Sequence, residues 1–171
     1  FTWAKEANAE VKLFYNDYNL DSQTSKVNSV VDMVADFKKR TIPIDGIGSQ
    51  MHIGYSYPDL TTISNTLSPL VGTGLLIHFS ELDMSVNRDL VLTSLTTERA
   101  NAQKEKYKSI AVLYKTIPSA QRFGITFWGL RDNDSWLRGW PVKTDYEWPL
   151  LFDSNYGYKA AYTGFLEGLN K

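Results

Sequence analysis

The feature that most constrains this chain is a regular alternation of apolar, strand-like segments with amphipathic, helix-like segments. Four short segments rich in β-branched and aromatic residues are each followed by a longer segment whose apolar residues recur at helical spacing. The expected strands are residues 11–16, 44–53, 75–83 and 123–129. Strands that are apolar along their length and separated by helices predict a parallel sheet covered by helices, which is an α/β fold.

The helical segments reveal their expected buried faces. They cover residues 22–40, 57–71 and 98–117, and a last helix closes the chain; Pro58 suits the first turn of the second helix. We expect the following residues to face inward: Val27, Val30, Val31, Val34 and Phe37; Leu60, Ile63, Leu67 and Leu70; Tyr107, Ile110, Ala111, Tyr114 and Ile117; and Tyr158, Ala161, Tyr162, Phe165 and Leu169. This order fits either a small doubly wound sheet or half of an eight-stranded barrel. No glycine-rich phosphate-binding motif follows a strand, which disfavours a nucleotide fold.

Composition excludes several classes of function. The chain of 171 residues has 18 basic and 19 acidic side chains without a basic cluster, so we expect no nucleic-acid partner. No apolar run approaches the length of a membrane span, so we expect no membrane partner. Cysteine is absent, which excludes disulfides and thiolate chemistry and leaves the redox compartment open.

Polar residues gather where the four expected strands end. They are Asn16, Asp17, Tyr18 and Asn19 after the first strand, Gln50 and His52 at the second, Glu81 and Asp83 at the third, and Trp128 at the fourth. A parallel barrel carries its active site on this rim, because all its strands end there. The arrangement therefore favours an active site over ordinary loop polarity.

Side-chain alternation groups these residues further. Glu81 and Asp83 are two residues apart, so they share one face of a strand, and Gln50 and His52 do the same. His78 is expected on the opposite face, toward the helices, as a structural residue. His52 with the two carboxylates is a conceivable metal site, but no metal-ligand spacing motif is present and we expect none.

Tryptophan is concentrated in one loop region, at positions 128, 136, 140 and 148. Flat amphipathic rings beside carboxylates suit the surface of a sugar, although burial in the core is expected for at least one of them.

Several of these segments resemble the motifs of a known protein family. The segments "LFYNDYN" (13–19), "DGIGSQMHI" (45–53), "FSELD" (79–83), "GITFWGLRDNDSW" (124–136) and "PLLFD" (149–153) resemble the strand-end motifs of glycoside hydrolase family 10, in the family's order and spacing. That family comprises retaining endo-β-1,4-xylanases, which act on xylan or xylo-oligosaccharides without a cofactor. The resemblance implies a (β/α)₈ TIM barrel, of which residues 1–171 supply strands five to eight.

The resemblance also implies roles. Glu81 is expected to be the nucleophile, and Asp83 is expected to anchor His52, whose ring points toward Glu81. Gln50 is expected near the sugar at the cleaved linkage, with Trp128 and Trp136 as walls; Tyr18 is expected on the leaving-group side, and Asn19 is a further expected substrate-binding residue.

The family's acid/base glutamate lies in an Asn-Glu motif after the fourth barrel strand, and no such pair occurs in this chain. We therefore expect a fragment that is inactive alone and needs an N-terminal half-barrel as its partner. The family also implies an extracellular, periplasmic or cell-surface location. Two alternatives stay open: a barrel relative that binds xylan without cutting it, and a retaining β-glucanase of the same fold.

Overall fold

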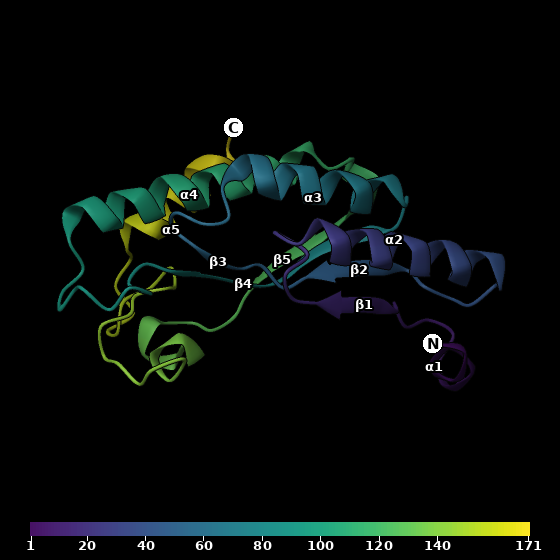
Figure 1. Ribbon diagram of the computed structural model, residues 1–171, viewed down its shortest axis with the longest axis horizontal. Coiled ribbons are helices and arrows are strands. Elements are labelled where there is room, and N and C mark those ends of the chain that lie inside the picture. Colours follow the sequence, from purple (N-terminus) through teal and green to yellow (C-terminus); the bar gives the residue numbers. More distant parts are fainter.

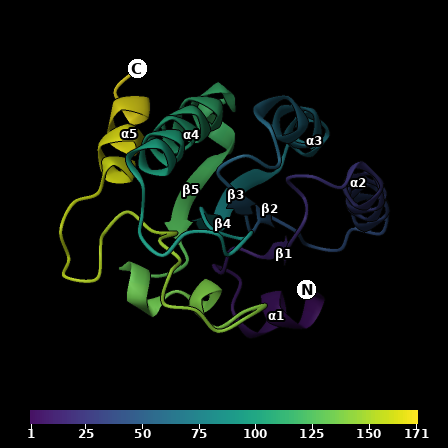
Figure 2. The ribbon, with the colours of Figure 1, turned by 60° about the vertical axis from the view of Figure 1, so that its left-hand side comes forward.

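The computed structural model describes residues 1–171 and contains a parallel sheet with helices along one face (Figure 1). The strands are β1 (Phe14–Asp17), β2 (Gly46–Ser49), β3 (His52–Gly54), β4 (Leu76–Ser85) and β5 (Arg122–Phe127). The helices are α1 (Thr2–Ala7), α2 (Thr24–Lys39), α3 (Leu60–Gly72), α4 (Thr97–Thr116) and α5 (Ala160–Leu169), with 3₁₀ turns at Ser119–Gln121, Asp132–Asp134 and Trp136–Arg138. Helices α2 to α5 form an arc along one side of the strands (Figure 2).

The sheet is built around β4. This ten-residue strand pairs in parallel with β2 along its first half and with β3 along its second half, and β5 pairs with it on its other edge. β1 pairs in parallel with β2 and forms the opposite edge of the sheet. The predicted single strand 44–53 is thus two strands, because Met51 adopts a left-handed conformation with φ of 63° and interrupts the run.

A β-bulge in β4 changes which residues face the helices. The register with β5 shifts between Phe79 and Leu82, so Ser80 and Glu81 together occupy one position of the ladder. Before the bulge, Ile77 and Phe79 are buried toward the helices; after it, Leu82 and Met84 are. The alternation of side chains between the two faces of β4 is therefore reversed after the bulge.

The bulge makes the prediction for His78 wrong. His78 lies on the inner face of the sheet, where its ring contacts Phe14 at 6.1 Å and Phe123 at 5.0 Å between centroids. Its Nε2 is 2.8 Å from Thr126 Oγ1. Regular alternation between His78 and Glu81 would put the two side chains on opposite faces, but the extra residue of the bulge puts them on the same face.

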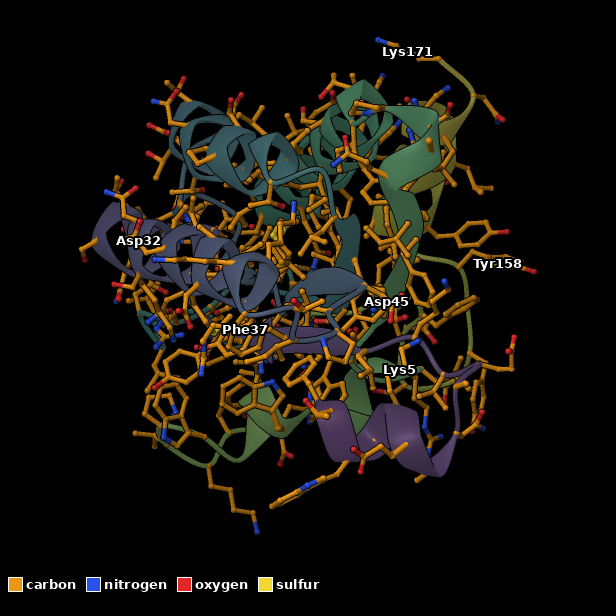
Figure 3. The ribbon with its side chains drawn as sticks, turned by 90° about the vertical axis from the view of Figure 1, so that its right-hand side faces the viewer. Lys5, Asp32, Phe37, Asp45, Tyr158 and Lys171 are labelled. Atoms are coloured by element: carbon orange, nitrogen blue, oxygen red, sulfur yellow. The ribbon has the colours of Figure 1, made fainter.

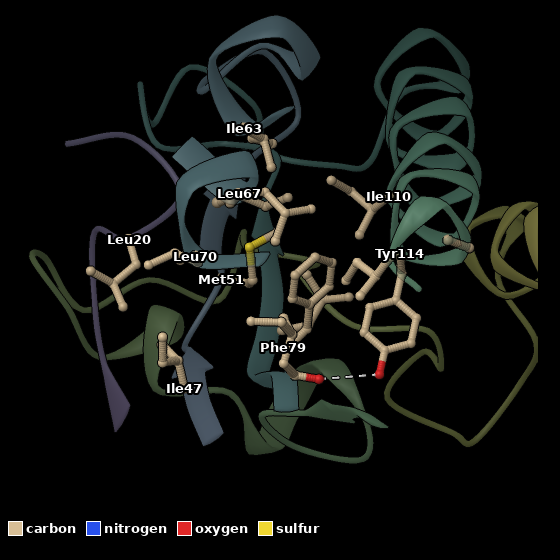
Figure 4. Packing of buried hydrophobic residues seen from close by; sticks show 14 of the residues in the cluster. Leu20, Ile47, Met51, Ile63, Leu67, Leu70, Phe79, Ile110 and Tyr114 are labelled. Carbon is tan, nitrogen blue, oxygen red and sulfur yellow. Dashed lines mark hydrogen bonds between the residues drawn. The ribbon is translucent and has the colours of Figure 1, made fainter. Parts of the chain in front are cut away.

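The hydrophobic core lies between the sheet and the helices (Figure 4). Phe79 packs edge-on against Tyr114 of α4, with ring centroids 5.0 Å apart, and the Tyr114 hydroxyl donates to the Ile77 carbonyl at 3.3 Å. The predicted stripe of α4 is fully buried, and so are most of the predicted inward residues of the other helices. No helix combines the length and the apolarity needed to cross a membrane.

Three predicted inward residues are exposed instead. Leu60 is 38% exposed because it begins α3 just after its N-cap residue Asp59, and Pro58 precedes that cap instead of occupying the first turn. Tyr158 is 72% exposed because it precedes α5, and its ring points outward (Figure 3). Leu169 is 38% exposed at the last residue of α5.

Helices α4 and α5 pack closely through glycine. A Cβ on Gly164 would lie 2.2 Å from the Lys104 carbonyl oxygen, a distance that only a backbone shift can relieve. Gly72, at the end of α3, has no atom within 4 Å of an added Cβ.

We expect Gly164→Ala to lower the free energy of unfolding by about 1–3 kcal/mol, because the methyl group forces the two helices apart. Gly72→Ala is the matched control, and it should be neutral or stabilising by up to about 1 kcal/mol through loss of unfolded-state entropy. Urea unfolding of both variants measures the difference. Equal stability of the two variants would contradict the close packing.

Candidate active site

The site is a chain of hydrogen-bonded side chains centred on β4. Glu81 accepts a hydrogen bond through Oε1 from Asn16 Nδ2 at 2.8 Å, and its Oε2 lies 3.4 Å from His52 Nε2. The other ring nitrogen of His52, Nδ1, is 3.0 Å from Asp83 Oδ1. Asp83 Oδ2 then accepts from the indole nitrogen of Trp136 at 2.7 Å. One imidazole thus bridges two carboxylates.

The register of the strands explains how these side chains meet. β3 pairs with β4 so that His52 is directly opposite Asp83. Asn16 reaches Glu81 across β2 because Gly48 leaves the space open: a Cβ on Gly48 would lie 2.4 Å from Asn16 Oδ1. Ser80 holds the same amide oxygen, donating to it at 2.5 Å, which turns the Asn16 NH₂ group toward Glu81.

Burial and charge set the protonation of the bridge. The Asp83 side chain is fully buried, and desolvation raises its pKa despite the hydrogen bonds from His52 and Trp136 that oppose this. Burial alone would lower the pKa of His52, but the Asp83 hydrogen bond and the two negative charges outweigh it and raise this pKa above 6.5. The imidazolium form of His52, which can donate to both carboxylates, is therefore more favoured than in a free histidine.

A cavity of about 790 Å³ opens beside this chain. The predicted substrate-binding residues Tyr18, Asn19, Gln50, Trp128 and Trp136 all line it, together with His52 and Asp83. Gln50 and His52 reach the same cavity although the break at Met51 separates them. No group of three or more histidine, aspartate or glutamate side chains is arranged to hold a metal ion.

Aromatic rings form one wall of the cavity. Trp136 stacks on Trp140, with centroids 5.2 Å apart and an angle of 29° between the planes. Trp128 is 47% exposed, so its ring is free to contact a ligand. Tyr18, on another part of the lining, carries the Lys26 ammonium 3.7 Å from its ring centroid. Of the tryptophans expected near a sugar surface, Trp148 is not part of the lining.

Sequence reasoning missed two members of the site. Asn16 was among the polar residues at the strand ends, but its contact with Glu81 depends on Gly48 and Ser80 and was not predicted. Trp140 was in the tryptophan-rich loop, yet nothing in its spacing distinguished it from Trp148. Its position follows from stacking on Trp136, which a pattern of single residues does not reveal.

Comparison with known proteins decides the family. The model of glycosyl hydrolase family 10 matches residues 1–168. The chain belongs to that family. The family's fold is a (β/α)₈ barrel, so the predicted fold class is confirmed, with this chain supplying only part of the barrel.

The family 10 relatives are xylanases. The endo-β-1,4-xylanase Xyn10C of Cellvibrio japonicus is 40% identical over 99% of this chain and 30% of its own length. An endo-1,4-β-xylanase of Geobacillus stearothermophilus is 34% identical over 95% of this chain and 50% of its own length. The solved structure of native xylanase 10C from C. japonicus covers the whole chain with a TM-score of 0.93 and 38% identity. A mutant of that enzyme has also been solved in complex with xylopentaose. The chain spans about a third to a half of the length of these relatives.

The two histidines of this family 10 chain provide a direct test of the bridge. We expect the pKa of His52 to lie above 6.5 and that of His78 below it, because burial of His78 is not offset by a carboxylate. Asp83→Asn should lower the pKa of His52, since it removes one of the two charges that favour the imidazolium, and should leave His78 unchanged. NMR titration of the ring resonances measures both; an unmoved His52 would contradict the bridge.

Proposed function

We propose that this chain provides the nucleophile side of the active site of a retaining endo-β-1,4-xylanase, with Glu81 as the nucleophile. The observation that carries the proposal is the fixed Glu81 carboxylate, held by Asn16 on one oxygen and by His52 on the other. The family 10 relatives, named as endo-1,4-β-xylanases, support xylan as the substrate.

In the proposed first step, a Glu81 oxygen attacks the anomeric carbon while the glycosidic C–O bond breaks, which leaves a covalent glycosyl-enzyme. A second carboxylic acid protonates the departing oxygen and later deprotonates the water that releases the sugar. Each Glu81 oxygen keeps a lone pair free for the attack, since each accepts only one contact. We propose that the second carboxyl group lies in the part of the barrel outside this chain.

The support around Glu81 suits this role. A nucleophile must stay ionised at the working pH although Asp83 is close by. The imidazolium of His52 compensates the negative charge of Glu81, and buried Asp83, whose two oxygens are engaged by His52 and Trp136, holds the ring in place. Asp83 and His52 are thus positioning residues in this proposal.

The cavity supplies the sugar-binding surface. Trp128 and Trp136 present ring faces that suit the apolar faces of a pyranose, and Gln50 and Asn19 offer amide groups that suit its hydroxyls. Tyr18 lies on the lining from β1 and is proposed to contact the leaving-group side. No cofactor takes part. Since polymeric xylan does not cross membranes, we propose an extracellular, periplasmic or cell-surface location.

In the full-length enzyme, we expect Glu81→Ala to lower kcat on xylan by several orders of magnitude, because the covalent step is lost, while xylo-oligosaccharide affinity largely remains. Added azide should restore turnover of an activated aryl xyloside and give the inverted glycosyl azide. The measurement is steady-state kinetics with product analysis.

The matched control is Glu105→Ala, which removes an exposed carboxylate from helix α4, on the far side of the sheet, and should leave the kinetics unchanged. If Glu81→Ala retains ordinary xylanase rates, the assignment of the nucleophile is wrong.

The proposed unit of His52 and Asp83 predicts non-additive kinetics. His52→Asn and Asp83→Asn should each lower kcat/KM less than Glu81→Ala does, and the double variant should resemble the single variants, because each change already uncouples the ring from its anchor. A double-mutant cycle measures this. Additive losses would show that the two residues act independently.

The inner face of the sheet predicts the behaviour of residues 1–171 alone. Phe123 is 50% exposed beside Phe14, and edge strands β1 and β5 have no neighbour on their outer side. We expect this segment to be inactive on xylan and prone to aggregate, and to regain activity when an N-terminal half-barrel is co-expressed. Loss of acid catalysis alone forfeits about 10²–10⁴-fold in rate. A soluble segment that cuts xylan unaided would refute this expectation.

A further inference from the structure

The cavity contains one cationic side chain that the proposed mechanism does not use. Its lining includes two arginines, Arg88 and Arg99, both from the region that follows β4. Arg99 is fully engaged: it donates to the Val86 carbonyl at 2.5 Å and to the Asp89 carboxylate at 3.1 Å, and it lies over the ring of Tyr55. Arg88 is exposed and forms no ion pair or hydrogen bond; its guanidinium lies 5.1 Å from the ring centroid of Trp140.

The acidic residues of the cavity do not neutralise Arg88. Asp89 is paired with Arg99, and Asp83 is paired with His52 and Trp136. Asp21 is 3% exposed, and no ion pair joins it to Arg88. No acidic side chain of this chain that lines the cavity therefore compensates the Arg88 charge.

The loop that carries Arg88 is held rigidly. The buried carboxylate of Glu147 accepts hydrogen bonds from the backbone N–H groups of Val86 and Asn87 at 2.6 and 3.2 Å, and from the Ser85 hydroxyl at 3.0 Å. The Asn87 side chain, itself fully buried, donates to the carbonyls of Tyr146 and Leu92 at 2.6 and 3.0 Å. Arg88 thus projects from a fixed backbone, which lowers the entropy cost of binding a ligand.

Arg88 is also connected to the catalytic residues by contact. Trp140 beneath it stacks on Trp136, whose indole nitrogen binds Asp83. β4 has both of its neighbouring strands within this chain, so the strand that precedes Arg88 is in place without the rest of the barrel. A sugar bound near Trp136 would therefore place its neighbours or side groups within reach of the guanidinium.

We propose that Arg88 binds a carboxylate-bearing sugar substituent, such as a uronic acid, on the xylan chain held in this cavity. This inference rests on the proposed xylanase function. A β-1,4-xylan backbone has hydroxyl groups and no ionised group, so the charge of Arg88 has no counterpart on the unsubstituted polymer. The Arg88 guanidinium, beside the Trp140 indole, carries paired N–H groups that match a carboxylate.

The test compares one glucuronoxylan before and after chemical reduction of its carboxylates to neutral hydroxymethyl groups. The two polymers differ only in charge. We expect the full-length wild-type protein to have a kcat/KM about two- to fivefold higher on the acidic polymer, in the range of an exposed ion pair. Arg88→Gln should bring this ratio close to one, and Arg88→Lys should retain part of it. Added salt should lower the wild-type ratio, because the attraction is screened.

Arg40→Gln is the matched control, since Arg40 pairs with Asp36 at the end of α2 and does not line the cavity. It should keep the wild-type ratio. Equal kcat/KM on both polymers, or an unchanged ratio in Arg88→Gln, would overturn the inference while leaving the xylanase function intact. If neither polymer is hydrolysed, the proposed function fails, and the binding constants of the two polymers measured by calorimetry still decide whether Arg88 recognises the carboxylate.

Discussion

The site depends on one feature of the backbone, the bulge in β4 at Ser80 and Glu81. This strand pairs with β2, β3 and β5, so it is the rigid centre of the sheet. In a regular strand, side chains would continue to alternate between the two faces beyond Phe79. Glu81 and Asp83 would then point toward the helices, and Leu82 and Met84 would lie on the inner face of the sheet. The extra residue turns both carboxylates to the inner face while keeping an unbroken apolar surface for the core.

The bulge has an electrostatic consequence. Two carboxylates on one face repel each other, and Asp83 is also fully buried, which is costly for an isolated charge. The pairing of β3 with β4 offsets this by placing His52 opposite Asp83 and within 3.4 Å of Glu81. One positive ring then serves two negative groups, and the indole of Trp136 satisfies the remaining oxygen of Asp83. Electrostatics and strand register therefore specify the same arrangement.

Predictions from the sequence were correct where they depended on the regular period of a helix or strand, and they failed where a local irregularity of the backbone intervened. The prediction of the buried face of α4 was correct because a long helix has a fixed period and a single buried face. The grouping of Glu81 with Asp83 was correct because the strand alternates regularly from Glu81 onward, and the placement of His78 was wrong because the bulge lies between His78 and Glu81. The left-handed Met51 and the reach of Asn16 over Gly48 were not predictable, since each depends on a local conformation or a missing side chain that only the folded chain displays. The resemblance to family 10 identified the motifs, and the geometry around them had to come from the structure.

The central claim, that Glu81 is the nucleophile, is tested most directly by trapping the covalent intermediate. A 2-deoxy-2-fluoro xylobioside with a good leaving group should form a long-lived adduct, because the fluorine slows both formation and hydrolysis of the glycosyl-enzyme, whereas the good leaving group accelerates formation only. Peptide mass spectrometry of the inactivated full-length protein should locate one fluoroglycosyl group on Glu81. An adduct on another carboxylate, or hydrolysis of xylan with inversion and no adduct, would contradict the account.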